Sequence, residues 1–223
     1  MEDAQTQPDE PTEELRLFPL NVVLFPGMTM PLRIFEERYK LMIGECLDAK
    51  EPFGVTLIQA GAEVGGGATP HLTGTTARIT NVERLDDGRM NLSTQGERRF
   101  RVVDTVHEVP YLKARVRYLP EEPGEVDPEE LAKLRGLFKE YLRGLASLQG
   151  GWVRQAQGPE DAGALSHTVA HYMELPAMAK QRLLELAFIG ERIHYEVPLL
   201  EGANRRLRGQ IVGRSPYKGT RLN

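Results

Sequence analysis

Two histidines are the residues of this chain whose types and spacing best suit metal binding. His167 and His171 are four residues apart, a spacing that places both imidazoles on one face of a helix. A zinc protease of this type also needs a glutamate directly after the first histidine, and Thr168 stands there. The apolar residues Leu165 and Val169 lie on the opposite face, so the sequence predicts solvent-facing histidines and no metal site.

A serine beside the first histidine is the only hint of hydrolase chemistry. Ser166 precedes His167, but adjacent helical residues point about 100° apart, so the pair is poorly placed to act as nucleophile and base. No Gly-x-Ser-x-Gly segment exists to expose a serine at a strand-to-helix turn. We therefore expect no enzyme and assign no catalytic residue.

The glycine-rich segment 61–67, GAEVGGG, is the remaining candidate for a cofactor site. A nucleotide-binding P-loop needs Gly-x-x-x-x-Gly-Lys-Ser/Thr, because the lysine must reach the phosphate that the backbone amides hold. This segment has no lysine and runs into Ala68-Thr69-Pro70, which is typical of a loop. The sequence predicts a plain loop here, with neither cofactor-binding residues nor a cofactor.

Basic residues and one tryptophan are the candidate partner-binding residues. A predicted strand alternates basic with apolar side chains, which indicates either an ordinary solvated face or a basic strip for an acidic partner. No acidic residue follows Glu201, and the resulting basic tail either tracks phosphates or simply aids solubility. The sole tryptophan lies in a predicted loop, where it pins the loop or anchors a partner. The candidates are Lys113, Arg115, Arg117, Trp152, Arg205, Arg206 and Arg208.

Composition narrows the functional class. The 223 residues include 28 Lys and Arg against 32 Asp and Glu, a formal net charge of −4, which disfavours a general nucleic-acid binder. The single cysteine, Cys46, excludes an intrachain disulfide, suits a reducing compartment and should pack as a small apolar residue. The start of the chain is polar and acidic rather than a signal peptide, and no apolar run approaches the ~18 residues of a membrane helix. We expect a cytoplasmic protein with no membrane contact.

The elements that must position these residues begin with a proline-rich stretch. Residues 17–39 read LFPLNVVLFPGMTMPLRIFEERY, which predicts a strand, a Pro-Gly corner, a second strand and then a helix. Prolines of this kind are compatible with edge strands and sharp turns only. We expect corners at Pro19, Pro26, Gly27 and Pro31, and core-filling side chains at Phe35 and Tyr39.

Further strands follow this opening. The turn Asp86-Asp87-Gly88 joins strands predicted at 74–85 and 89–94, and a bulge near Asn81 would turn Val82 inward. Other strands are predicted at 53–58, 99–106 and 111–118. Several short antiparallel strands with one helix favour a small, partly closed barrel over an open sheet.

From Asp127 the apolar period becomes helical. Asp127 is the expected cap of a first helix with Pro128 at its first position. Later helices are predicted around 165–173, from 176 to 189 and from 198 to 208. The predicted organisation is a disordered acidic tail at 1–14, a β-rich subdomain at 15–122, a helical bundle subdomain at 123–208 and a basic tail at 209–223.

The order and spacing of several motifs resemble the N-terminal, substrate-binding domain of Lon proteases. FPL, LFPG and PLRIFEERY match its opening, and later matches include Gly74-Thr75, Asp87-Gly88-Arg89 and Arg99-Phe100. The resemblance covers residues 15–207 and implies an α+β fold, a PUA-like barrel followed by a helical bundle. The chain lacks both the P-loop of the Lon ATPase and a Ser-Lys peptidase pair. The resemblance therefore implies a stand-alone recognition domain.

Two hypotheses of function follow. The first is a protein-binding module that recognises unfolded or degron-bearing polypeptides, or serves as a proteolysis adaptor with a protease or chaperone partner. It would use apolar contacts between the two halves, with strand addition to an uncapped barrel edge. The alternative is RNA association through the barrel and the basic tail. The sequence does not set the oligomeric state.

Overall fold

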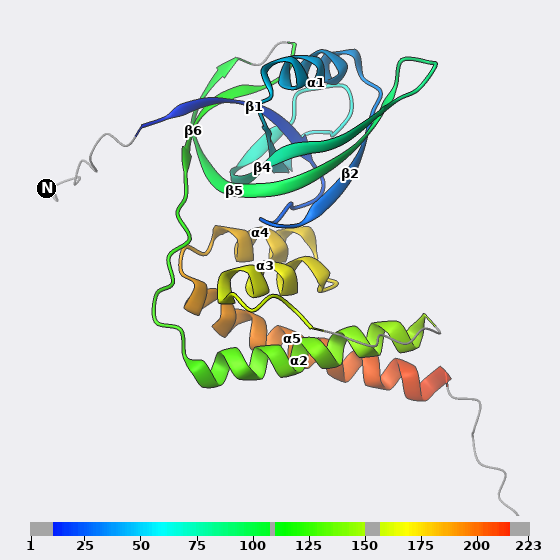
Figure 1. Cartoon of the computed structure of the whole chain (residues 1–223), viewed down its shortest axis with the longest axis vertical. Helices are drawn as coiled ribbons and strands as arrows, with labels where there is room; N and C mark the ends of the chain where they lie inside the picture. Colours follow the sequence, from blue (N-terminus) through cyan, green and yellow to red (C-terminus); the bar gives the residue numbers. More distant parts are fainter. Residues whose placement is uncertain (1–10, 108–109, 150–156, 215–223) are drawn as a thin grey trace, which may run out of the picture. The chain divides into compact units, whose positions relative to one another are not determined.

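The computed structural model describes residues 11–107, 110–149 and 157–214 (Figure 1). Within this part of the chain the fold has mixed α+β content, as predicted, with a six-stranded sheet and five helices. The elements are β1 (Glu13–Leu20), β2 (Thr29–Ile34), α1 (Glu37–Ala49), β3 (Phe53–Ala60), β4 (Thr69–Arg84), β5 (Met90–His107), β6 (Lys113–Tyr118), α2 (Pro128–Leu148), α3 (Ala162–Tyr172), α4 (Ala177–Glu185) and α5 (Ile189–Arg214).

The chain divides into two compact units, and the division differs from the predicted one. The first unit runs to Pro120 and also contains Ala177–Glu185, so α4 belongs with the strands although the sequence placed it in the helical bundle. The reason is polar docking on β4: Gln181 Nε2 donates to the Thr73 carbonyl at 3.0 Å. The second unit contains α2, α3 and α5.

The sheet has the order β2-β5-β4-β3-β1-β6, with an additional pairing of β5 with β6. It is not the all-antiparallel barrel predicted from the sequence, because β1 and β3 pair in parallel, Leu17 beside Gly54 through Leu20 beside Leu57. The two strands predicted at 89–94 and 99–106 form one strand, β5, which pairs with β2 along its first part and with β6 along its last. This arrangement leaves β2 at an edge.

A bulge in β4 confirms the predicted inward turn. The register of β4 against β5 shifts between Ile79 and Asn81. Val82 then packs, partly buried, against the core. By simple alternation Val82 would lie on the outer face of this strand. The bulge turns it inward, because one extra residue in a strand exchanges the two faces of the residues that follow.

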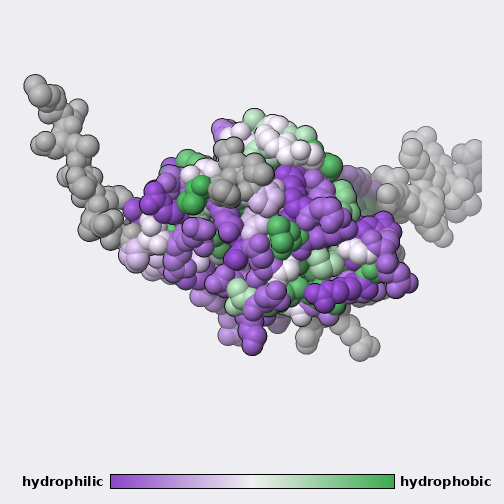
Figure 2. All heavy atoms as spheres, turned by 90° about the horizontal axis from the view of Figure 1, so that it is seen from above, coloured by the Kyte–Doolittle hydropathy of each residue, from purple (hydrophilic) through white to green (hydrophobic). Residues whose placement is uncertain are grey.

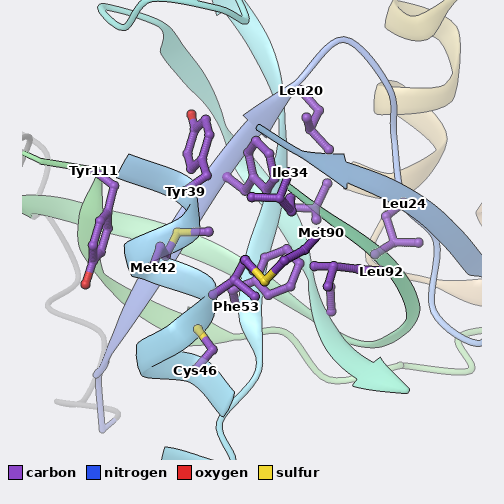
Figure 3. Close-up of a cluster of buried hydrophobic side chains, with 14 residues drawn as sticks. Leu20, Leu24, Ile34, Tyr39, Met42, Cys46, Phe53, Met90, Leu92 and Tyr111 are labelled. Atoms are coloured by element: carbon purple, nitrogen blue, oxygen red, sulfur yellow. The ribbon is translucent and has the colours of Figure 1, made fainter. Parts of the chain in front are cut away.

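The core of the β-rich unit gathers side chains from α1 and from β1, β2, β3 and β5 (Figure 3). Tyr39 and Cys46 lie in it, 5% and 1% exposed, as predicted. Burial raises the pKa of the Cys46 thiol to about 11, which keeps it protonated and unreactive at neutral pH. Gly74 is required here, because a Cβ on it would lie 2.4 Å from the Val55 carbonyl oxygen.

The helical unit is built on two parallel helices, α2 and α5. Asp127 caps α2 by accepting from Glu129 N at 2.8 Å, with Pro128 at the first position, as predicted. Two ion pairs show that the helices run parallel, because the residue numbers of the paired residues increase along both helices. Lys133 pairs with Glu201 at 2.7 Å, and Glu140 pairs with Arg208.

The two helices predicted at 176–189 and 198–208 are wrong in their boundaries. The structure has α4 ending at Glu185 and a single helix, α5, that contains Pro198. Proline removes one helical hydrogen bond. Here buried residues on both sides, Val197 and Leu200, hold the helix in place across it. None of the described helices is both long and apolar enough to cross a membrane.

Candidate functional site

The histidine pair does not form a metal site in the described part of the chain. His167 is 2% exposed, and its Nε2 lies 3.0 Å from Glu121 Oε1. The prediction that both imidazoles face solvent is wrong for His167, because α5 covers this region: Arg192 Nε donates to Ser166 Oγ at 2.7 Å. No described group of three His, Cys, Asp or Glu residues has metal-binding geometry.

The predicted basic strip lies on β6 with its alternation confirmed. Ala114 and Val116 are fully buried, while Arg115 is exposed. Arg115 is, however, neutralised by Asp104, whose Oδ1 lies 2.8 Å from its Nε. The Lys113 ammonium lies 5.5 Å from the centre of the Tyr111 ring. The strip is therefore less electropositive than its sequence indicates, and Arg117, the third residue of the strip, is half-buried.

The other predicted binding residues lie in the helical unit or outside the described residues. Arg205 and Arg206 are exposed on α5. Arg208 donates from Nε to Glu140 at 2.6 Å. Trp152 lies outside the described residues. The described candidates are thus divided between the β-rich unit, with Lys113, Arg115 and Arg117, and the helical unit, with the three arginines of α5.

A pocket beside β2, called here the apolar pocket, is the alternative candidate site. It has a volume of about 240 Å³ and lies in the β-rich unit where β2 leads into α1. Most of its lining residues are apolar or aromatic, as in most binding pockets, and three charged residues, Arg33, Glu36 and Glu63, also line it. The lining residues are Phe18, Leu20, Pro31, Leu32, Arg33, Ile34, Phe35, Glu36, Tyr39, Glu63 and Val64.

Two large apolar side chains stand exposed at this pocket. Phe35 is 49% exposed and Val64 is 57% exposed. The prediction that Phe35 fills the core is wrong, because the preceding residue, Ile34, takes the inward position and is 1% exposed. Figure 2 shows apolar residues in small groups on a largely hydrophilic face, so apolar side chains grouped around a hollow are notable.

The pocket's charged groups are used to hold its walls. Glu36 pairs with Arg38 at 3.0 Å and accepts from Gly65 N at 3.2 Å. Glu63 accepts from the backbone N and the side-chain Nδ2 of Asn21 at 3.0 and 2.7 Å. The glycine-rich segment is thus a loop, as predicted, fastened to the start of α1. Both carboxylates are thus engaged by neighbouring groups, and Arg33 adds a positive charge to the same wall.

Tyr39 forms the rigid floor of the site. Its ring centre lies 4.0 Å from that of Phe18, and the Arg38 guanidinium lies 4.3 Å from its centroid. Burial raises the pKa of the Tyr39 hydroxyl. Such stacking fixes the rotamers around the pocket before any ligand arrives, which lowers the entropy cost of binding.

The predicted corners of the proline-rich opening are confirmed at Pro26 and Gly27 and wrong at Pro19 and Pro31, which lie within strands. Gly27 has φ of +78°, which glycine tolerates best, and its N–H donates to the Gly96 carbonyl at 2.8 Å. Pro26 precedes it in the turn, Pro19 lies within β1 and Pro31 is exposed within β2. Strand parity after Ile34 was the one sequence signal that could have placed Phe35 on the surface.

Two larger hollows lie elsewhere in the described part of the chain. One of about 480 Å³, beside Arg38 and residues 65–67, is shaped by an arginine already paired with Glu36. The other, of about 680 Å³ in the helical unit, is lined by several carboxylates and His194, which bonds Glu130. The apolar pocket beside β2 combines the exposed side chains of Phe35 and Val64 with the stacked rings of Phe18 and Tyr39.

Comparisons with known proteins agree on one family. The model of the ATP-dependent protease La (LON) substrate-binding domain matches residues 14–202. The chain is 29% identical over 191 residues to a Lon protease of Anaeromyxobacter dehalogenans, covering 83% of this chain and 23% of that protein. It is 32% identical over 197 residues to a Lon protease of Methylocella silvestris, covering 86% and 24%. The chain thus spans about a quarter of the length of these relatives.

Solved structures show the same likeness. The Lon N-terminal domain protein from Xanthomonas campestris aligns with a TM-score of 0.62 and 29% identity, over 82% of this chain and 96% of that one. The N-terminal domain of a Mycobacterium avium complex Lon protease aligns with a TM-score of 0.62 over 85% and 98%, at 20% identity, and so supports the fold alone. The resemblance inferred from the sequence motifs is confirmed.

Proposed function

The chain belongs to the family of Lon substrate-binding domains, and from this we propose that it captures unfolded or degron-bearing polypeptides through the apolar pocket beside β2. The family match lies with the substrate-binding domain, which is not a catalytic part of Lon. We propose that the chain itself catalyses no reaction and delivers polypeptides in the cytoplasm to a protease or chaperone. We also propose that its β-rich unit is of the PUA-like class.

The observation that carries this proposal is the exposure of Phe35 and Val64 at the pocket. Unfolded polypeptides differ from folded ones in displaying large apolar side chains. Burying one such side chain contributes about 1.5–3 kcal/mol, which gives weak and reversible capture once the cost of association is included. Because the contact is apolar, binding should tolerate salt.

Replacing Phe35 and Val64 together with serine is expected to weaken this capture about tenfold, the effect of losing ~1.4 kcal/mol of apolar contact. The probe is a reduced, carboxymethylated protein that cannot refold, titrated by fluorescence anisotropy. Leu72→Ser is the matched control, because Leu72 is also 49% exposed in the β-rich unit but does not line the pocket. Equal binding by the double variant and the parent would contradict the proposed site.

RNA association is the alternative proposal. Exposed Arg205 and Arg206 on α5 support it, while the ion pair of Arg208 with Glu140 weakens it. Phosphate binding releases counterions, so affinity for an RNA probe should fall steeply between ~50 and ~200 mM salt and on replacing both exposed arginines with alanine. An affinity unchanged by salt and by these replacements would argue against this alternative.

A further inference from the structure

The edge strand β2 presents a row of main-chain groups to its surroundings. One edge of β2 pairs with β5, and no other strand in the described ranges pairs with its second edge. Gly96 N donates to the Met28 carbonyl at 2.8 Å, so that carbonyl points toward β5. Main-chain groups alternate in direction along an antiparallel strand. The carbonyls and amides of Thr29, Pro31 and Arg33 therefore point away from β5, to the free edge.

Pro31 supports this assignment independently. A proline has no N–H, so within a sheet it occupies positions where that donor would face solvent. Pro31 pairs with Ser93 in the middle of β2 without a break in the register. The free edge thus offers three carbonyls and the N–H groups of Thr29 and Arg33. The missing donor at Pro31 also makes pairing with the same edge of a second copy less favourable.

The apolar pocket opens onto this free edge. Its lining includes Pro31 to Phe35 on one side and Phe18 and Leu20 of β1 on the other. No residue of β5 lines it, and β1 does not pair with β2. Leu20 and Ile34, from the two sides, lie in the same region of Figure 3. The hydrogen-bonding groups of the free edge of β2 therefore lie next to the apolar pocket.

We propose that an extended segment of an unfolded polypeptide adds to β2 as a further strand and places one large apolar side chain in the pocket. This inference rests on the proposed function and specifies its mode. Main-chain hydrogen bonds supply affinity whatever the sequence, and the pocket selects an apolar residue at one position. Folded proteins hide both features at once, so the edge distinguishes unfolded segments from folded surfaces.

Two substitutions at one position separate the main chain from the side chain. Arg33→Ala and Arg33→Pro both remove the guanidinium, but only the proline removes the N–H that faces the free edge, and neither removes a bond to β5. Arg33→Ala is the reference for binding of a fluorescent peptide of alternating leucine and serine, because the Arg33 side chain itself lines the pocket. We expect Arg33→Pro to bind this peptide about fivefold more weakly than Arg33→Ala does, the effect of one main-chain hydrogen bond.

A peptide experiment on the unaltered protein keeps the proposal testable should Arg33→Pro not fold. The same leucine-serine peptide is made with N-methyl groups on alternate residues, in both frames, which blocks main-chain donors and keeps the side chains. At least one frame should lose most of its affinity. Equal affinity in both frames would overturn strand addition and leave pocket binding intact.

The remaining outcomes are also decisive. If neither the plain peptide nor the carboxymethylated protein binds, the proposed function fails and the inference with it. If sedimentation shows that the chain dimerises through β2, detected as dimers lost in Arg33→Pro and kept in Arg33→Ala, the occupant is a second copy and the polypeptide assignment is overturned.

Discussion

Replacing Arg99 with methionine is expected to lower the free energy of unfolding by about 3 kcal/mol and to detach α4 from the β-rich unit. Arg99 is 1% exposed, and its Nη1 donates to the Leu184 carbonyl at 2.9 Å. Leu184 lies in the last turn of α4, whose carbonyls lack helical partners and carry the negative end of the helix dipole. Nη2 donates to the Pro120 carbonyl at 3.0 Å. Methionine fills similar space but leaves both carbonyls without this donor.

The measurement is urea unfolding together with hydrogen exchange of α4. Arg101→Met is the control, because Arg101 lies two residues further along β5 on the same face and is exposed. It should change stability by less than about 0.5 kcal/mol. Unchanged protection of the α4 amides in Arg99→Met would show that Gln181 and apolar contacts hold the helix without the arginine.

Arg99 also marks the limit of what the sequence predicted. The strand predicted at 99–106 lies within β5, since the period of a strand is a local property of the sequence. That a helix about 80 residues later would cover an outward-facing arginine depends on a tertiary contact, which no local pattern reveals. The same reason explains α4, placed by periodicity as a helix but assigned to the wrong unit.

The candidate site, too, could be predicted only in part from the sequence. The proline-rich opening predicted the order of strand, turn, strand and helix, because proline and glycine act locally on the backbone. The pocket needs Leu20, Val64 and Phe35 to meet, and these come from three segments separated in sequence. Phe35 was predicted in the core together with Tyr39, but it precedes α1 and follows the inward-facing Ile34. The family motif identified the right stretch of chain but not which of its residues face outward.

Glu196 gives the second large prediction, a stability that changes with pH. Its side chain is fully buried in the helical unit, and loss of solvation raises its pKa well above the ordinary value, against smaller opposing effects of Ser166 and Arg192. Arg192 lies one turn away but is already bonded to Ser166, to Glu121 Oε2 at 3.0 Å and to the Leu186 carbonyl. Because the Arg192 guanidinium is engaged by these groups, the effect of burial on the pKa outweighs that of its charge. Glu196 therefore stays protonated to a higher pH than an ordinary glutamate.

The sign follows from proton binding in the two states. Between the ordinary glutamate pKa and the raised native value, the folded protein holds a proton that the unfolded chain has lost. Folding stability contributed at this site is therefore greatest at acidic pH and falls as pH rises through that interval. Glu196→Gln keeps the shape without the ionisation. It should match the parent near pH ~4 and be more stable than the parent at pH ~8, by about 1.4 kcal/mol for each tenfold difference in proton affinity between the folded and unfolded parent.

Stability curves of the two proteins, measured by urea unfolding and far-ultraviolet circular dichroism from acidic to alkaline pH, check this prediction. Glu191→Gln is the control, since Glu191 is exposed on the same helix and its loss should leave the pH slope unchanged. His167 and Arg192 both pair with the carboxylate of Glu121, so only the difference between the parent and Glu196→Gln isolates Glu196. A Glu196→Gln variant less stable than the parent at alkaline pH would mean that Glu196 is ionised and held by Arg192. Arg192 would then be shared between two carboxylates.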